Sequence, residues 1–170
     1  MADFHTHVVV QPSIPNACMT PLERWLLEAV FESEANGDEA TYFFASDNIE
    51  PGIAINEKLQ DMLRGETSPL AAPLCRAIEA ASAGDAWLDL DSFDGHVAVF
   101  QAIIARHRDQ LPFVTLETAY TCSKMHPDGF GGRAELITAG DVRWVSTSFW
   151  LENEIGALEL AGAEAANARP

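Results

Sequence analysis

The chain has 170 residues, of which 26 are Asp or Glu and 10 are Lys or Arg, so its formal net charge is −16. This length fits one domain, and with 48% apolar residues that domain can bury its own core without a disulfide or a metal. Such an excess of carboxylates repels phosphates, which argues against direct binding of nucleic acid or a membrane and favours a basic protein partner. Solubility is the alternative reason for the acidity.

The three cysteines are Cys18, Cys75 and Cys122, which are far apart and form no CxxC motif. This usage suits a reducing compartment. The first ten residues lack a basic start and an apolar stretch of the length found in signal peptides, and no apolar run is long enough to cross a bilayer. We therefore expect a cytoplasmic protein.

The first elements are a strand over 4–10 and a helix that begins after Thr20. The strand contains three successive valines and stops before Pro12, and we expect residues 1–19 to be an edge strand followed by a loop. Thr20, Pro21 and Glu23 have the N-cap, first-turn proline and capping-box pattern of a helix start. We expect this helix to run to Gly37.

The middle of the chain alternates between strands and helices. We expect strands over 41–45 and 86–90, a turn-rich link over 46–55, and helices over 56–65, 69–82 and 92–108.

The last third predicts a hairpin and a final helix. Strands over 113–123 and 133–138 flank a glycine-rich loop, a helical turn begins at Thr138, and the final helix begins at Thr147 or Ser148. Its Phe149, Trp150 and Leu151 are expected in the core, with a homo-oligomer contact as the alternative. Residues 162–170 read as a frayed tail. The predicted class is α+β, with four to five helices packed on a small mixed or antiparallel sheet.

Two histidines near the N-terminus raise the question of a metal site. His5 and His7 are two residues apart on a strand and so lie on one face. The segment Asp3-Phe4-His5-Thr6-His7 resembles the first-strand motif of metal-dependent amidohydrolases, whose α/β barrel takes about 250 residues. This chain is shorter and has no second histidine-rich strand end, so we predict no metal ligand here.

Two further groups of residues could form a metal site or a reactive thiol, but each also has a purely structural explanation. Asp85, Asp89, Asp91 and Asp94 could hold Mg²⁺, but acids also favour the start of a helix. Cys122 with His126 could be an activated thiol, although a strand cysteine is more commonly buried and inert. We therefore predict no catalytic residue and no cofactor, and keep a small metal-binding or Cys-dependent enzyme as the alternative.

The glycine-rich loop has neither a Walker nor a dinucleotide-binding pattern and reads as a hairpin connection. Three basic residues lie in or beside the loop, although the chain has few of them, and we expect a phenylalanine to be exposed near its tip. Loops of this kind often carry contact residues. We predict a binding role for Lys124, His126, Phe130 and Arg133.

The densest acidic stretch runs from residue 20 to residue 66, where 11 acids stand against three cations. Rows of carboxylates on a rigid surface can imitate the phosphates of DNA and occupy a basic groove. We predict Glu28, Glu32 and Glu34 as binding residues, with an ordinary solvated surface as the alternative.

Two blocks of the sequence resemble uncharacterised accessory proteins of bacterial plasmids and other mobile elements. The first is the helix start from Thr20 to Leu27, and the second consists of residues 120–125, 127–132 and 136–139. The resemblance implies a setting in which small acidic proteins inhibit host defence, as DNA mimics or anti-CRISPR proteins. It carries over no activity and no site residue, so we expect a non-enzymatic protein that binds a basic protein surface.

Overall fold

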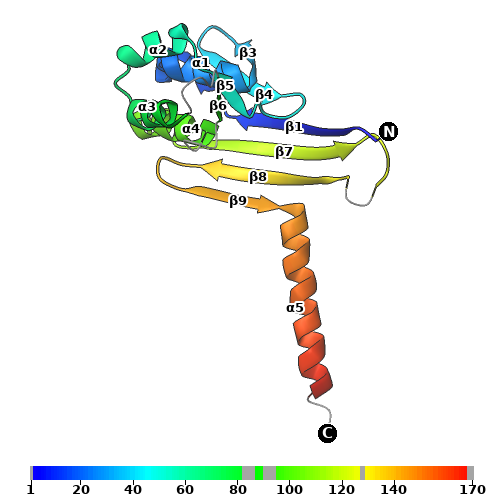
Figure 1. Ribbon diagram of the computed structural model, residues 1–170. Helices are drawn as coiled ribbons and strands as arrows, with labels where there is room; N and C mark the ends of the chain where they lie inside the picture. The colour runs from blue at the N-terminus through cyan, green and yellow to red at the C-terminus, as the bar shows by residue number, and fades with distance from the viewer. Residues whose placement is uncertain (1, 82–86, 90–94, 127–128, 168–170) are drawn as a thin grey trace.

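Seven strands form the main sheet of the computed structural model, which describes residues 2–81, 87–89, 95–126 and 129–167 (Figure 1). All of its strand pairs are antiparallel. The strand order is β2-β4-β1-β7-β8-β9. β1 and β2 pair with different parts of one edge of β4, and β3 pairs with its other edge. The strands are β1 (Phe4–Gln11), β2 (Ile14–Pro15), β3 (Glu32–Asn36), β4 (Ala40–Ala45), β7 (Val114–Cys122), β8 (Gly131–Ile137) and β9 (Val142–Ser146).

Five α-helices and a small second sheet complete the described part of the chain. The helices are α1 (Pro21–Val30), α2 (Glu57–Arg64), α3 (Ala71–Ala80), α4 (Gly95–Arg106) and α5 (Thr147–Asn167). The second sheet pairs β5 (Gly52–Ala54) with β6 (Trp87–Asp89), and a short 3-10 helix covers Asn16–Cys18. The α+β class is therefore as predicted, although the sheet is larger than expected.

The core lies between one face of the sheet and the helices α1 to α4, which gather over one end of the strands (Figure 1). Side chains of β1 alternate, with Val8 and Val10 buried and their neighbours more exposed. Val10 lies opposite Leu116 of β7, and Phe43 of β4 is fully buried. The opposite face of the sheet carries none of these core residues.

The helix starts that depend on local caps are as predicted. The Thr20 hydroxyl accepts a hydrogen bond from the Glu23 amide, and the Glu23 carboxylate accepts one from the Thr20 amide, which makes a complete capping box. Asn56 caps α2, and Gly65 ends it.

The predicted helix from residue 21 to Gly37 is wrong beyond Val30. Residues 32–36 form β3, which pairs along its whole length with β4. Gly37 has the positive φ of 67° that the sequence suggested, but it uses this conformation in the turn between β3 and β4 rather than at a helix end.

Three further differences concern the two ends of the chain. The strand β1 is an interior strand between β4 and β7, not an edge, because both of its backbone edges are paired. Residues 138–141 form a hydrogen-bonded turn into a strand, β9, where a helical turn was expected. The final helix begins at Thr147 as predicted and continues to Asn167, through part of the expected frayed tail.

The expectation that the start of α5 fills the core is also wrong. Phe149, Trp150 and Leu151 are each about half exposed, and the helix leads away from the rest of the chain after its first turns (Figure 1). No helix in the described ranges combines the length and apolarity that crossing a membrane requires.

Candidate functional site

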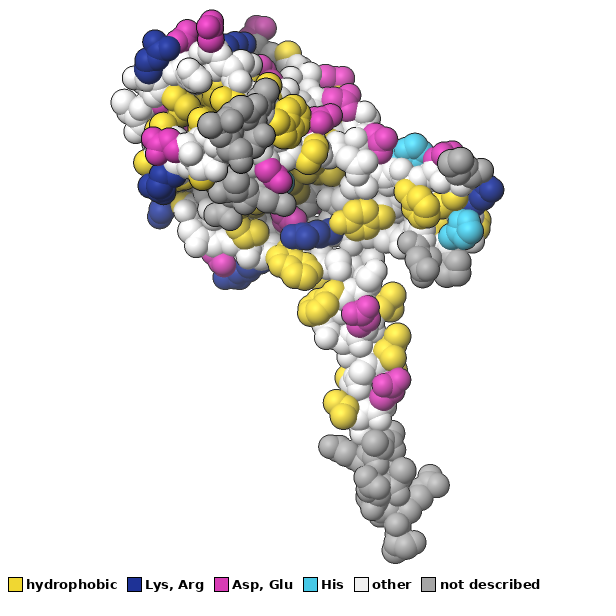
Figure 2. Space-filling view, in the orientation of Figure 1, with side chains coloured by type: hydrophobic (Ala, Val, Ile, Leu, Met, Phe, Trp, Pro, Cys, Tyr) yellow, Lys and Arg dark blue, Asp and Glu magenta, His cyan; other side chains and the backbone are white. Residues whose placement is uncertain are grey.

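An acidic surface forms around the β3–β4 hairpin, which we call the acidic edge. It consists of Glu32, Glu34, Asp38, Glu39 and Asp47, all exposed. Residues 25–57 contain eight acids and no Lys, Arg or His. Figure 2 shows Asp and Glu side chains gathered over this side of the molecule. The hairpin thus concentrates negative charge in a part of the chain that has no cation of its own.

Two carboxylates of the acidic edge are placed by the strand itself. Glu32 and Glu34 lie on one face of β3, about 6.8 Å apart along the strand. They stand opposite Phe44 and Tyr42, whose rings stack with centroids 5.4 Å apart. Since β3 pairs only with β4 in the described sheet, its outer edge is open to a partner.

Glu32 is held in one position by Ser46. Its carboxylate accepts hydrogen bonds from the Ser46 hydroxyl and, at 2.8 Å, from the Ser46 amide. The hydroxyl and then the amide lower the pKa of Glu32 below its ordinary value. Glu32 therefore remains charged even in mildly acidic solution.

Glu28, which we predicted as a binding residue together with Glu32 and Glu34, lies outside the acidic edge. It is on α1, where its carboxylate pairs with Arg24 at 3.3 Å. Four other arginines are similarly paired with the chain's own carboxylates, namely Arg64 with Asp61, Arg106 with Glu23, Arg133 with Glu135 and Arg143 with Asp141. Half of the chain's ten Lys and Arg residues are thus in internal ion pairs, so they do little to offset the acidic edge.

The predicted contact residues of the glycine-rich loop separate into two places. Lys124, His126 and Phe130 are exposed at the end of the sheet away from α1 to α4, beside Met125, which is 89% exposed. Figure 2 shows hydrophobic, histidine and basic side chains together at that end.

Arg133 does not join them, because it belongs to β8 rather than to the loop. Its guanidinium stacks over the Trp144 ring at 4.8 Å, and its Nε lies 2.5 Å from Glu135 Oε1, close enough for an ion pair but not aligned as a hydrogen bond. Arg133 therefore lies on the sheet, apart from the other three residues, with a side chain that is 37% exposed.

The two N-terminal histidines lie close together, but they belong to no group of described side chains that could hold a metal ion. The rings of His5 and His7 stack with centroids 6.2 Å apart, and His5 Nδ1 lies 3.6 Å from Asp47 Oδ1. Across the described ranges no three His, Cys, Asp or Glu side chains meet in a way that could hold a metal ion. Of the aspartate cluster only Asp89 is described, at the end of β6, and Asp85, Asp91 and Asp94 lie outside the described residues.

Cys122 is buried rather than presented as a nucleophile. It is 7% exposed, and a Cβ added to Gly129 would lie 2.5 Å from the Cys122 Cβ, so the loop backbone packs directly over this side chain.

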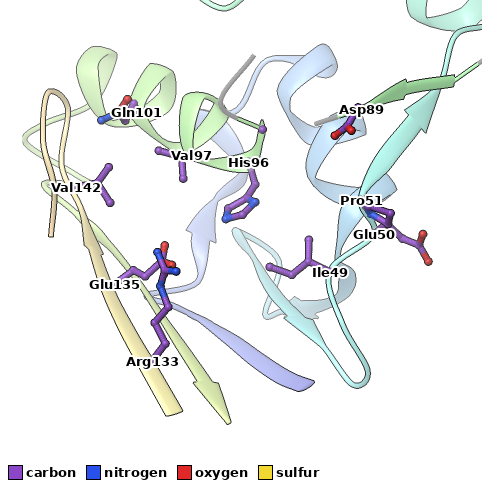
Figure 3. Close-up of a pocket in the computed structure, with 11 residues that line it drawn as sticks. Ile49, Glu50, Pro51, Asp89, His96, Val97, Gln101, Arg133, Glu135 and Val142 are labelled. Carbon is purple, nitrogen blue, oxygen red and sulfur yellow. The ribbon is translucent and has the colours of Figure 1, made fainter. Parts of the chain in front are cut away.

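Sequence reasoning missed a cleft of about 840 Å³ between α4 and β8. His96 reaches from α4 between Arg133 and Glu135 on one side and Ile49 on the other (Figure 3). Its residues come from distant parts of the chain, so no local motif marks it. The described residues that line it include the carboxylates of Glu50 and Glu135 and the imidazole of His96.

Comparison of the chain with protein-family models, with curated proteins and with solved structures finds no match. The similarity to accessory proteins of mobile elements accordingly stays a prediction.

Proposed function

We propose that this protein acts without catalysis, by binding a basic protein surface through its acidic edge. The observation that carries this proposal is the acidic edge itself, five exposed carboxylates around the β3–β4 hairpin at an open sheet edge, in a stretch of the chain without Lys, Arg or His. Complementary charge speeds association and selects the partner.

The groove of a nucleic-acid-binding protein is the partner chemistry that fits best, because it is built to receive regularly spaced negative charges. Glu32 and Glu34 provide two such charges on a fixed strand, and Asp38 and Glu39 extend them around the turn. An inhibitor of a host defence complex is the biological role that this chemistry supports.

The test is capture from a bacterial lysate at low salt, followed by elution in a salt gradient and mass spectrometry. The variant E34Q/D38N/E39Q removes three charges from the acidic edge and leaves the Glu32–Ser46 hydrogen bonds in place. The control variant E57Q/E79Q/D109N removes three exposed charges elsewhere. The proposal expects one dominant basic protein that the control retains and the acidic-edge variant loses. Equal capture by all three proteins, or no specific capture, contradicts it.

A further inference from the structure

The strand β3 ends the main sheet on the side of the acidic edge, and one of its backbone edges has no partner strand in the described part of the chain. Its five residues are all exposed, and they pair with β4 along the other edge (Figure 1). At about 3.3 Å per residue, the open edge offers about 16 Å of extended backbone. Such an edge is a template for an added strand, and many proteins bind extended peptides in this way.

The two faces of β3 differ in chemistry, so an added strand meets different neighbours on each face. Glu32 and Glu34 lie on one face, beside the two stacked aromatic rings of β4. Ser33 and Ala35 alternate with them and place small side chains on the other face. Acidic and small residues therefore alternate along the open edge with a period of two.

Both carboxylates on this face are accessible to a cation. Glu32 is fixed by its hydrogen bonds from Ser46, and Glu34 makes no hydrogen bond or ion pair with another described residue. The neighbouring rings of Tyr42 and Phe44 are partly exposed, and an aromatic face attracts a guanidinium or ammonium group. A long basic side chain beside the open edge therefore meets carboxylates and aromatic faces together.

A second copy of this chain does not fit the open edge. Antiparallel pairing of two β3 strands about Glu34 would place this carboxylate directly opposite its own copy. Like charges in that position destabilise a strand pair. A strand that carries basic side chains on this face meets attraction instead of repulsion.

We infer that the basic partner adds an extended segment to β3 as a new strand, with Lys or Arg at every second residue on the face of Glu32 and Glu34. Backbone hydrogen bonds supply the affinity of such a contact, and the side chains supply its specificity. The alternating cations set the register, because a slip of one residue moves all of them to the other face. This inference rests on the proposed function and states how the acidic edge holds its partner.

Synthetic peptides test the inference directly. The probe is the capped, fluorescently labelled peptide TRVRVRT, in which arginine occupies every second position, and fluorescence anisotropy follows its binding to the full chain at 50 mM NaCl. The peptide TVRRRVT has the same composition and charge, but in a strand its arginines do not share one face. We expect TVRRRVT to bind about tenfold more weakly than TRVRVRT. Equal affinity of the two peptides, or no binding of TRVRVRT, overturns the inference.

Backbone methylation distinguishes strand pairing from simple attraction between charges. The amides of alternate residues in a strand point to opposite edges, so the arginine amides and the valine amides of TRVRVRT cannot both face β3. One version of the peptide carries N-methyl groups on two arginines, and the other carries them on the two valines. We expect one version to bind about tenfold more weakly than the parent, because it loses backbone hydrogen bonds, and the other to keep its affinity within about twofold. Equal binding of the two versions overturns the inference.

Hydrogen–deuterium exchange of the full chain locates the added strand. We expect TRVRVRT to slow exchange at residues 32–36 and to leave β9, the opposite margin of the sheet, unchanged. Protection of β9 without protection of β3 overturns the inference.

The lysate capture with E34Q/D38N/E39Q separates a failure of this inference from a failure of the proposed function. If that variant loses the partner while the two methylated peptides bind alike, the acidic edge is a contact surface but β3 adds no strand. If the variant captures the partner as well as the wild type does, the proposed function is wrong and the inference fails with it.

Discussion

Glu23 and Arg106 join α1 to α4 through a bidentate ion pair inside the protein. Arg106 Nη1 lies 2.7 Å from Glu23 Oε1, and Nη2 lies 2.5 Å from Oε2. Glu23 is fully buried and also completes the capping box of α1, while Arg106 donates to the backbone oxygens of Ala102 and Cys18. The Glu23 carboxylate therefore accepts hydrogen bonds from the start of α1 and from the partly buried Arg106 guanidinium.

Removing one partner of this pair should be costly. We expect Glu23→Gln to lower the free energy of unfolding by about 3 kcal/mol, because it leaves Arg106 without its counter-charge in a largely buried place. Arg64→Gln, which breaks the exposed pair with Asp61, should cost about 0.5 kcal/mol or less. Urea denaturation measures both. Equal losses for the two variants would contradict the structural role of Glu23.

The stability of the protein should depend on the charge of Glu66. Partial burial opposes that charge, but hydrogen bonds from the amides of Ser68 and Thr67 and the hydroxyl of Thr20 outweigh it and lower the pKa of Glu66. A pKa that is lower in the folded state stabilises the protein above the unfolded pKa, and this contribution is lost as the pH falls through the folded value. Glu66→Gln should therefore be less stable than the wild type at pH 7, and the difference should shrink in acid. A difference that does not change with pH would contradict this account.

The three thiols should differ in reactivity. Cys75 is exposed, whereas Cys18 and Cys122 are buried. Burial also raises the pKa of Cys18, against the opposing influence of Arg106, so little thiolate forms there at neutral pH. A chromogenic disulfide reagent should label one thiol in the folded protein and three after unfolding. Rapid labelling of Cys122 in the folded protein would restore the Cys-dependent enzyme as an explanation.

The small β5–β6 sheet requires a glycine at position 52. A Cβ there would lie 2.2 Å from Trp87 Nε1 and 2.6 Å from the Leu88 backbone oxygen, and the backbone has little freedom to move away. We expect Gly52→Ala to destabilise the protein by about 1–3 kcal/mol. Gly140→Ala, with no atom within 4 Å of the new Cβ, is the matched control. Thermal unfolding of both variants checks the expectation, and similar melting temperatures would contradict it.

Local signals predicted the fold best where capping or alternation decides the structure. The capping box at Thr20 and the alternation along β7 each depend on a few neighbouring residues, and both predictions were confirmed. The chain from Glu32 to Asn36 has helix-like spacing, but its pairing with β4 decides the structure. Pairing depends on residues from the other side of a turn, which a local pattern does not contain.

The acidic edge and the exposure of α5 were predictable only in part. The acidic stretch was visible in the sequence, but its division between α1 and the β3–β4 hairpin required the strand pairing. The apolar start of α5 was visible as well, yet an apolar residue in a sequence does not reveal whether its own chain covers it. Only the direction in which α5 leaves β9 shows that its own sheet does not cover it.

The measurement that tests the central claim most directly is the affinity of the captured partner over a range of salt concentrations. We would titrate wild type, E34Q/D38N/E39Q and E57Q/E79Q/D109N between 50 and 300 mM NaCl by calorimetry. The account predicts a dissociation constant that rises steeply with salt for the wild type and the control, with weaker binding and a shallower salt dependence for the acidic-edge variant. Binding that is insensitive to salt, or identical in all three proteins, would show that the acidic edge is not the contact surface.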